Sequence, residues 1–552
     1  MDKPWLKSYP KDVAHEIDTN AYSSITQLFE ESVTKYRDLV AYTNMGGTLT
    51  YGELDELSRD FAAYLQNKVG LKKGDRIAIQ MPNLIQYPIA LFGALRAGLI
   101  VVNTNPLYTA REMKHQFNDS GAKAILILAN FAYNLEEILP ETKIETVIVT
   151  ELGDMLGFPK SLIVNTVVKY IKKMVPKYKL PQAISFYEAL DEGQKSKFTP
   201  VEINHDDVAF LQYTGGTTGV SKGAMLSHSN MIANMMQISE WMKPKLKDGV
   251  ESIITALPLY HIFSLTVNCL SFMKIGGKNV LVTNPKDIPT FMKILKNEKY
   301  TTFAGVNTLF NALMNHPDFT KLDFSNLKVS IAGGMALQRV VADKWTKLTN
   351  TPIVEGYGLT ETSPLVSCNP IDGTDKVSTI GLPAPSTDIR LIDEENNDVK
   401  PGERGELCVK GPQVMKGYWQ RPEETAKVML DGGWIKTGDI ATMDDDGFLK
   451  IVDRKKDMIL VSGFNVYPNE VEDVVAAHKN VLEVAAVGIP DEKSGEVVKI
   501  FVVKRGEISK EELIEYCRKS LVGYKVPKEI EFRTELPKTN VGKILRRALR
   551  AS

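Results

Sequence analysis

A glycine- and threonine-rich segment, YTGGTTGVSKGAML at residues 213–226, carries the strongest chemical signal in the sequence. It directly follows an apolar run of the kind that forms a buried strand. Backbone amides and hydroxyl groups in such a loop can donate hydrogen bonds to a polyphosphate, and Lys222 adds a positive charge. The segment is not a Walker A motif, because Val220 and Ser221 separate Gly219 from Lys222. On its own, the loop is equally compatible with an ordinary turn.

The length and composition indicate a globular protein with more than one domain. A chain of 552 residues exceeds what a single core usually holds, and 43% hydrophobic with 24% charged residues is an ordinary balance. Because 67 Lys and Arg nearly cancel 68 Asp and Glu, bulk charge argues against a nucleic-acid partner. The four cysteines have neither metal-ligand nor disulfide spacing, which favours a reducing, cytoplasmic setting. The N-terminus lacks the apolar core of a signal peptide, so no export is expected.

Apolar strands alternate with amphipathic helices over the first two-thirds of the chain, which predicts an α/β fold. Helical patterns occupy residues 54–65 and 287–297. Predicted strands lie at residues 76–81, 124–128, 146–150, 208–213, 280–283, 302–306 and 329–332. This rhythm is typical of a large layered α/β N-terminal domain with substantially parallel sheets.

The texture of the sequence changes towards the C-terminus. Short strands joined by polar turns predict a small β-subdomain at about residues 386–453. The last stretch predicts a small α+β domain, with helices at 469–478 and 510–521 and strands at 484–487, 497–503 and 529–533. We therefore expect an N-terminal domain at residues 1–453 and a C-terminal domain at residues 454–552.

Two segments bear on a membrane. Residues 252–273 carry no formal charge, but Pro258, His261 and Asn268 would be costly in lipid, so we expect a buried segment and no span. Residues 160–179 hold six lysines and no acid, with apolar residues at helical spacing. This pattern predicts a basic amphipathic helix that could lie on the cytoplasmic face of the inner membrane. A helix docked on the main domain with a solvated basic face is the simpler alternative.

Five strings occur in a fixed order: the 213–226 loop, GGMALQ (333–338), EGYGLTETSP (355–364), a long stretch from GGWIKTGD to NEVE (432–472) and PKTNVGKILRR (537–547). Together they resemble the adenylate-forming superfamily of acyl-CoA synthetases, luciferases and peptide-synthetase adenylation domains. The stretch at 434–456 resembles the signature of fatty-acyl-CoA synthetases. ALPLYHIFSLT (256–266) and GVNTLFNAL (305–313) resemble bacterial long-chain fatty-acid–CoA ligases.

The resemblance implies a ligase reaction in two halves. In this family, a carboxylate attacks the α-phosphorus of ATP to give an acyl-adenylate and pyrophosphate, and the thiolate of CoA then displaces AMP. It therefore implies an AMP-forming acid–thiol ligase with Mg²⁺ as cofactor and with fatty acid, ATP and CoA as substrates. It also implies that the C-terminal domain is mobile and pivots between the two half-reactions.

The resemblance assigns catalytic roles to Lys543, Thr360 and Glu361. Lys543 would bridge the carboxylate and the α-phosphate, and Thr360 would hydrogen-bond the α-phosphate. Glu361 would bind the metal, since Mg²⁺ prefers one or two carboxylates together with phosphate oxygens. Positive charge at Lys543 suits a step in which two anions meet.

Nucleotide contacts are assigned in the same way. Tyr357 would stack on adenine, Asp439 would accept hydrogen bonds from the ribose hydroxyls, and Arg454 would contact ribose or phosphate. The full set assigned to ATP and AMP is Tyr213, Thr214, Gly215, Gly216, Thr217, Thr218, Gly219, Lys222, Gly334, Glu355, Gly356, Tyr357, Gly358, Thr360, Asp439, Arg454 and Lys543.

The remaining assignments concern the hinge, CoA and the acyl chain. Lys456 corresponds to the hinge between the domains. The predicted CoA channel is lined by Ser462, Gly463 and Phe464. The predicted acyl pocket contains Tyr260, His261 and Val306. For His261, and for His228 at another histidine position of the family pattern, a structural or pocket-shaping role is favoured over metal binding, because no Cys/His/carboxylate cluster adjoins them.

The ATP motifs do not choose among carboxylic acids, so the long-chain substrate follows from the resemblance alone. A medium-chain or aryl-acid CoA ligase and a fatty-acyl-AMP ligase are the enzyme alternatives. An inactive acyl-nucleotide binding protein at the membrane is the alternative that is not an enzyme. The sequence does not fix the oligomeric state, and a homodimer is one option.

Overall fold

The computed structural model describes residues 3–214, 221–462, 464–491, 493–539 and 542–550. One sheet has the strand order β7 (Ile184–Ser185), β6 (Thr146–Thr150), β5 (Ala124–Leu128), β3 (Arg76–Gln80), β4 (Ile100–Asn103), β8 (Val208–Thr214) and β9 (Lys222–Ser227). Its neighbouring strands run parallel except β8 and β9. The parallel strands are buried apolar runs, as a sheet covered on both faces requires.

A second sheet packs beside the first and combines distant parts of the chain. Its order is β16 (Leu382–Pro383), β15 (Leu365–Cys368), β14 (Ile353–Gly358), β13 (Val329–Ala332), β12 (Thr302–Gly305), β10 (Ser252–Thr255), β11 (Lys278–Leu281), β1 (Val40–Asn44) and β2 (Gly47–Thr50). From β14 to β1 every neighbouring pair is parallel. The hairpin of β1 and β2 therefore adds to strands from much later in the sequence.

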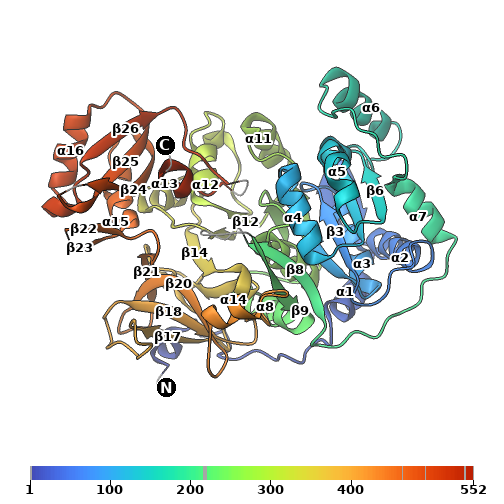
Figure 1. Cartoon of the computed structure of the whole chain (residues 1–552), viewed down its shortest axis with the longest axis horizontal. Coiled ribbons are helices and arrows are strands. Elements are labelled where there is room, and N and C mark those ends of the chain that lie inside the picture. The colour runs from blue at the N-terminus through green and yellow to red at the C-terminus, as the bar shows by residue number, and fades with distance from the viewer. Residues whose placement is uncertain (1–2, 215–220, 463, 492, 540–541, 551–552) are drawn as a thin grey trace.

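Helices cover these two sheets (Figure 1). They are α1 (Ile25–Lys35), α2 (Tyr51–Asn67), α3 (Gln86–Arg96), α4 (Ala110–Ser120), α5 (Ala132–Ile138), α7 (Phe186–Gln194), α8 (His228–Met242), α11 (Ile288–Asn297), α12 (Asn307–Met314) and α13 (Arg339–Thr349). Side-chain caps fix several helix starts; Thr50 and Glu53 form a capping box at the start of α2. Helix α3 is buried along its whole length, which places it inside the layer.

Two smaller units follow. The first has the order β17 (Asp388–Ile392), β18 (Gly405–Lys410), β20 (Trp434–Met443) and β19 (Met429–Leu430), with β21 (Leu449–Arg454) paired to β20 and α14 (Pro422–Val428) alongside. The second contains β22 (Ile459–Val461), β23 (Phe464–Val466), β24 (Val481–Asp491), β25 (Gly495–Lys504), β26 (Glu529–Arg533), α15 (Pro468–Ala476), α16 (Lys510–Arg518) and α17 (Arg546–Arg550). It has its own apolar core (Figure 1).

The predicted fold class is confirmed: a layered α/β part, a small β unit and a small α+β unit follow one another. Three predicted strands, 124–128, 146–150 and 329–332, coincide with β5, β6 and β13. The predicted strand at 280–283 begins two residues earlier, at Lys278. The domain limits at residues 386 and 453 stay predictions, and they fall close to the start of β17 and the end of β21.

The predicted helix over residues 160–179 is wrong in its length. Helix α6 (Lys160–Thr166) continues as a π-helical turn, η4 (Val167–Ile171), and then stops. Lys173 has a positive φ of 50°, and Pro176 cannot continue a helix, so the chain leaves the helical path there. In Figure 1 this segment projects from the edge of the N-terminal part.

Residues 252–273 form buried structure, as expected. The segment contains β10, α9 (Ile262–Ser264), the π-helical turn η5 (Leu265–Leu270) and the first residues of α10 (Ser271–Lys274). Within the part of the chain that the structure describes, no helix is both long and apolar enough to cross a membrane.

Helices α2 and α7 touch through backbone atoms at Gly193, which yields a test of the packing. A Cβ atom at Gly193 would lie 1.9 Å from the carbonyl oxygen of Asp60, so Gly193→Ala must push the helices apart. Helix propensity alone predicts that Gly193→Ala stabilises the folded protein by about 1 kcal/mol. Overpacking of the two helices destabilises it by about 1–3 kcal/mol. We expect the first thermal transition to move to lower temperature. The control is Gly523→Ala, where the added methyl group meets nothing within 4 Å; an unchanged or higher first transition for Gly193→Ala would contradict the close contact.

Candidate active site

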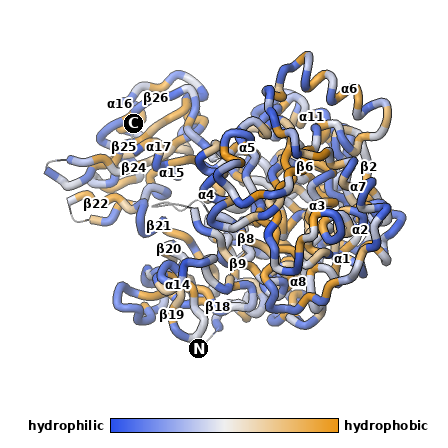
Figure 2. Tube along the Cα trace, turned by 45° about the vertical axis from the view of Figure 1, so that its right-hand side comes forward, coloured by the Kyte–Doolittle hydropathy of each residue, from blue (hydrophilic) through white to orange (hydrophobic). Residues whose placement is uncertain are grey.

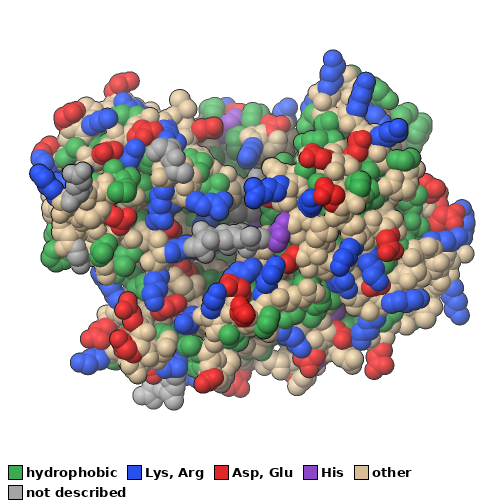
Figure 3. Space-filling model, in the orientation of Figure 1, with side chains coloured by type: hydrophobic (Ala, Val, Ile, Leu, Met, Phe, Trp, Pro, Cys, Tyr) green, Lys and Arg blue, Asp and Glu red, His purple; other side chains and the backbone are tan. Residues whose placement is uncertain are grey.

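A cavity of about 1290 Å³ lies between the N-terminal part and the C-terminal unit. The loop after β13 and strand β14 form one wall, strands β20 and β21 form another, and α15 with the segment before α17 closes it from the C-terminal side. Lys and Arg side chains gather around the hollow between these parts (Figure 3). The carboxyl ends of parallel strands thus open into the cavity, which is where α/β sheets usually bind ligands.

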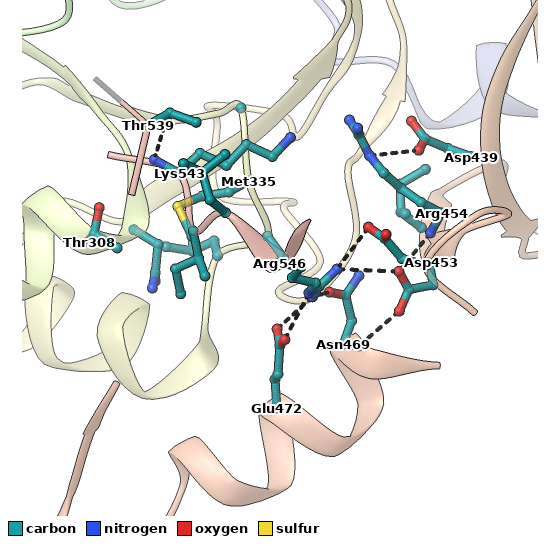
Figure 4. A pocket seen from close by; sticks show the side chains of 18 of the residues that line it. Thr308, Met335, Asp439, Asp453, Arg454, Asn469, Glu472, Thr539, Lys543 and Arg546 are labelled. Atoms are coloured by element: carbon teal, nitrogen blue, oxygen red, sulfur yellow. Dashed lines mark hydrogen bonds and ion pairs between the residues drawn. The ribbon is translucent and has the colours of Figure 1, made fainter. Parts of the chain in front are cut away.

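Many of the predicted site residues meet in this cavity. Those that line it are Gly334, Glu355, Gly356, Tyr357, Gly358, Asp439, Arg454, Lys456 and Lys543. They come from four separate regions of the chain and from both sides of the predicted domain boundary. Figure 4 shows Asp439, Arg454 and Lys543 in this arrangement.

Asp439 and Arg454 form one corner of the cavity. They are directly opposite each other in the antiparallel pair of β20 and β21, and Arg454 Nε lies 3.3 Å from Asp439 Oδ1. The hydroxyl of Tyr357 donates a hydrogen bond of 2.5 Å to Asp439 Oδ2. Burial raises the pKa of Tyr357 well above its usual value, so the phenol remains a donor. This corner offers a nearly buried carboxylate, a guanidinium and an aromatic ring.

Glu355 lies within β14, opposite Ala332 of β13, and its carboxyl group is buried. One oxygen accepts a hydrogen bond from the backbone N–H of Leu337 at 3.2 Å. Burial, with a smaller contribution from Asp473 across the cavity, raises the pKa of Glu355 to about 8. At neutral pH the group is therefore mostly the uncharged acid, able to donate as well as accept.

Lys543 reaches the cavity on a tight loop. The backbone N–H of Lys543 donates to Thr539 Oγ1 at 3.0 Å, and the N–H of Thr539 donates to the carbonyl of Lys543 at 2.6 Å. From the N-terminal side, the hydroxyl of Thr308 donates to the carbonyl of Gly542 at 3.0 Å. Burial first, and then the charge of Arg454, lower the pKa of Lys543 to about 7. A bound anion would raise this pKa and hold the side chain in its charged ammonium form.

Lys456 adds to the positive potential. Burial and the charge of Arg454 lower its pKa to about 8. The positively charged side chains that line this cavity repel one another. The arrangement suits a polyanion, because phosphate oxygens would offset the repulsion.

Strands β8 and β9 flank the predicted phosphate loop in the sequence. Gly215, Gly216, Thr217, Thr218 and Gly219 lie outside the described residues. Tyr213 and Thr214 end β8, and the hydroxyl of Tyr213 donates to Asp119 at 2.7 Å. Lys222 begins β9 and forms an ion pair of 2.7 Å with Glu424 on α14.

Tyr418 connects Lys222 to the predicted metal ligand. Its hydroxyl donates to Glu361 Oε1 at 2.7 Å, and Lys222 Nζ lies 4.6 Å from the centre of its ring. Thr360 and Glu361 lie together in the short 3₁₀ turn η7 (Thr360–Thr362) after β14. Sequence reasoning missed Tyr418, because no motif identifies a lone aromatic residue outside the strings. The segment that contains Tyr418 pairs with β9, since the backbone N–H of Trp419 donates to the carbonyl of Gly223.

Glu361 is a single carboxylate, not part of a preformed metal cage. The described residues contain no group of three or more His, Cys, Asp or Glu side chains placed to hold a metal ion. A hard divalent cation at Glu361 would therefore need further oxygens from a bound ligand or water, which is the coordination that Mg²⁺ prefers.

The predicted acyl-pocket residues lie behind this cavity. Among the described residues, its lining does not include Tyr260, His261 or Val306. Burial and the charge of Lys543 lower the pKa of His261 to about 4, so its ring is neutral at pH 7. Val306 lies against the Lys543 loop, since a Cβ atom at Gly542 would be 3.2 Å from its Cγ2.

His228 is structural, as favoured from the sequence. It begins α8 and is buried, and its Nδ1 accepts a hydrogen bond from the backbone N–H of Ile25 at 3.2 Å. Burial lowers the pKa of His228 to about 4, which keeps the ring neutral.

The predicted CoA residues are not brought to the cavity. Ser462 and Phe464 flank the turn between β22 and β23, and Gly463 lies outside the described residues. Phe464 is 56% exposed and stacks on Tyr524 with ring centres 4.8 Å apart. The structure thus presents the Lys543 end of the C-terminal unit to the cavity and leaves Ser462 and Phe464 away from it.

Arg546 is a second residue that sequence reasoning missed. Its guanidinium bonds both carboxylate oxygens of Glu472, at 3.0 and 2.7 Å, and lies in the cavity wall (Figure 4). The neighbouring Arg547 is exposed. In the sequence the two adjacent arginines look alike, and no signal there distinguishes the mostly buried Arg546 from the exposed Arg547.

The chain matches known proteins over its full length. It matches the AMP-binding enzyme family over residues 29–419 and the AMP-binding enzyme C-terminal domain over residues 470–543. It is 59% identical to a long-chain-fatty-acid–CoA ligase of Salmonella typhimurium strain LT2 and 56% identical to one of Haemophilus influenzae. Each alignment covers 100% of this chain and 98% of the relative.

A crystal structure supports the same fold. An anthranilate CoA ligase in complex with anthranoyl-AMP superposes with a TM-score of 0.85, covering 97% of this chain and 98% of that one at 22% identity. With both halves of the family pattern matched, and with near relatives aligned from end to end, this chain belongs to the family of AMP-binding enzymes.

Proposed function

We propose that this chain is an ATP-dependent long-chain fatty-acid–CoA ligase. It would convert fatty acid, ATP and CoA into fatty-acyl-CoA, AMP and pyrophosphate through an acyl-adenylate. The observation that carries the proposal is the position of Lys543 in one cavity with Asp439 and Arg454. The alignment from end to end with ligases of that name supports it.

Adenylation brings two anions together, the fatty-acid carboxylate and the α-phosphate of ATP. Lys543 would place its ammonium between them and stabilise the charge that develops on the phosphate oxygens. Thr360 would donate its hydroxyl to the α-phosphate. Lys222 would exchange its partner Glu424 for the outer phosphates. These groups are partly shielded from solvent, which strengthens each interaction because water competes less.

The nucleoside would bind at the Asp439 corner. Asp439 would accept hydrogen bonds from the ribose hydroxyls while Arg454 holds the carboxylate from its other side. Tyr357 would stack on adenine. The buried carboxyl of Glu355, two residues earlier in the same strand, would face the polar edge of the base.

Mg²⁺ fits the residues at the phosphate side. Glu361 offers a carboxylate that Tyr418 orients, and the phosphates of ATP would complete the coordination. When bound, the ion would neutralise phosphate charge. The chain itself contributes orientation, through the Tyr418 hydroxyl and the η7 turn.

The second half-reaction needs a different face of the C-terminal domain. Lys543 occupies the cavity while Ser462 and Phe464 lie outside it, so one docking of the domain does not serve both steps. We propose a pivot about Lys456 that withdraws Lys543 and brings the 462–464 turn to the acyl-adenylate. Hinges of this kind are a few residues at the ends of elements that absorb a large change in φ and ψ.

We also propose a peripheral contact with the cytoplasmic face of a membrane through the α6 region. Six apolar side chains there are between 53% and 86% exposed: Phe158, Leu162, Ile163, Tyr170, Ile171 and Met174. Basic residues surround them without an acid in the segment, and Figure 2 shows the mixed hydropathy of α6. Insertion of apolar side chains together with attraction to anionic lipid is the pattern of interfacial helices.

A substrate series tests the proposed function. For saturated acids of two to twenty carbons and for aromatic acids, CoA-dependent AMP release should give a kcat/KM that rises with chain length. Each buried methylene contributes about 0.8 kcal/mol, or roughly fourfold, until the pocket is filled. A higher kcat/KM for an aromatic or medium-chain acid would favour those ligases. Acyl-AMP formed without turnover of CoA would favour a fatty-acyl-AMP ligase, and no AMP release at all would favour an inactive binding protein.

The lowered pKa of Lys543 predicts proton uptake when ATP binds. At pH 8 an amine with a pKa of about 7 is mostly neutral, and a nearby triphosphate should raise that pKa and protonate it. We expect close to one proton to be taken up at pH 8 and less at pH 6, measured by calorimetry in buffers of different ionisation enthalpy. Lys543→Arg, which stays charged, should remove most of the uptake, whereas the surface control Lys347→Arg should not. Equal uptake by both variants would contradict the assignment.

Vesicle sedimentation tests the membrane contact. Replacing Lys169, Lys172 and Lys173 with glutamine should lower partitioning to anionic vesicles on the order of 100-fold at low salt, since each basic residue near the surface contributes about 1 kcal/mol. A matched control replaces three exposed lysines elsewhere: Lys195, Lys243 and Lys321. Soluble-substrate turnover should barely change in either. If both triple variants bind vesicles equally, the α6 region is not the contact.

A further inference from the structure

We infer that Asp453 is a positioning residue for adenylation, because it ties the segment that presents Lys543 to the N-terminal side of the hinge. The inference deepens the proposed function and rests on its pivot about Lys456. Asp453 was not among the residues expected to act in the reaction. Its position is visible in Figure 4, beside Arg546 and Asn469.

The Lys543 loop is anchored at Arg546, three residues further along the chain. Thr539 and Lys543 exchange two hydrogen bonds, from the Thr539 N–H to the Lys543 carbonyl and from the Lys543 N–H to Thr539 Oγ1, so the position of Lys543 depends on where the chain that follows it is held. Arg546 opens α17 and is held within the C-terminal unit by Glu472 at 2.7 Å and by Asn469 Oδ1 at 2.6 Å. A shift of this guanidinium would therefore carry Lys543 with it.

Asp453 supplies the contact from the other side of Lys456. It lies on β21, which pairs with β20 of the β unit, and its side chain is fully buried. Arg546 Nη1 lies 3.6 Å from Asp453 Oδ1, and the backbone N–H of Asn469 donates to Asp453 Oδ2 at 2.9 Å. Asn469 is in the first turn of α15, so the carboxylate also faces a helix N-terminus. Both partners belong to the C-terminal unit.

A pivot about Lys456 would break these contacts. The backbone N–H of Arg454, which donates to Asp453 Oδ1 at 2.7 Å, would remain because it lies before the hinge. A buried carboxylate that loses its cation is costly, so the pair favours the docking in which Lys543 reaches the cavity. Two further hydrogen bonds between the N-terminal part and the C-terminal unit are neutral, from Thr308 to the carbonyl of Gly542 and from Asn311 to the carbonyl of Leu482. Among these contacts, Asp453 makes the charged one.

Asp457 provides a matched control. One of its oxygens lies 3.6 Å from the same Arg546 nitrogen, the same distance as Asp453, but Asp457 follows Lys456 and would move with Arg546. Asp453→Asn and Asp457→Asn therefore remove the same charge from the same guanidinium. Only the first removes an attraction that spans the hinge.

The test measures the two half-reactions separately in single turnover. Adenylation is followed as pyrophosphate released from ATP and fatty acid, and thioester formation is followed from supplied acyl-AMP and CoA. For Asp453→Asn, the ratio of the adenylation rate to the thioester rate should fall at least about fivefold relative to the unmodified protein, the lower end of typical coupling effects. Asp457→Asn should leave that ratio within about twofold, which is below the range of typical coupling effects.

The outcomes separate the inference from the proposed function. If the unmodified protein performs neither half-reaction, the proposed function fails. If it performs both and the two variants shift the ratio equally, or neither shifts it, the role of Asp453 is overturned. Should melting show that Asp453→Asn is unfolded, Arg546→Lys decides, since one ammonium cannot span Glu472 and Asp453 as the guanidinium does. A lowered ratio in Arg546→Lys supports the inference, and an unchanged ratio overturns it.

Discussion

The clustering of positive charge inside one cavity is the constraint on which the site depends. Lys543, Arg454 and Lys456 face the same space, and burial with mutual repulsion lowers the pKa of both lysines. The protein offsets this repulsion with carboxylates at fixed positions, Asp439 beside Arg454 and Asp453 beside Arg546. A bound polyphosphate would add negative charge and complete the compensation that these carboxylates provide only in part. The charges that would bind the nucleotide therefore lie beside the Asp453–Arg546 pair that connects the C-terminal unit to the β unit.

Phenol groups orient the carboxylates without neutralising them. Tyr357 donates to Asp439, and Tyr418 donates to Glu361 while its ring lies beneath Lys222. A neutral donor fixes the direction of a carboxylate and leaves its charge available for other partners. Asp439 still pairs with Arg454 at 3.3 Å, so the contact from Tyr357 orients this carboxylate in addition to the ion pair, whereas Tyr418 is the partner that orients Glu361.

Much of the fold was predictable because apolar runs of strand length leave few alternatives. The site residues were predictable where they belong to motifs, as at Lys543 and Asp439. Tyr418 and Arg546 were not, since their roles arise from tertiary contacts that no local pattern records. Arg546 and Arg547 differ only in which face of a short helix they occupy. The helix expected over residues 160–179 ended early for a local reason, a backbone turn at Lys173 that its composition does not reveal.

The order of strands in the larger sheet has a consequence for biosynthesis. The β1–β2 hairpin emerges from the ribosome early, but its parallel partner β11 begins only at Lys278. At 5–20 residues per second, the hairpin waits on the order of tens of seconds with one edge unpaired. During that interval Tyr42 and its neighbours, which are buried in the finished protein, have no core to enter. A nascent chain of this topology is thus exposed to aggregation early in translation and gains protection only when more than half of it has been made.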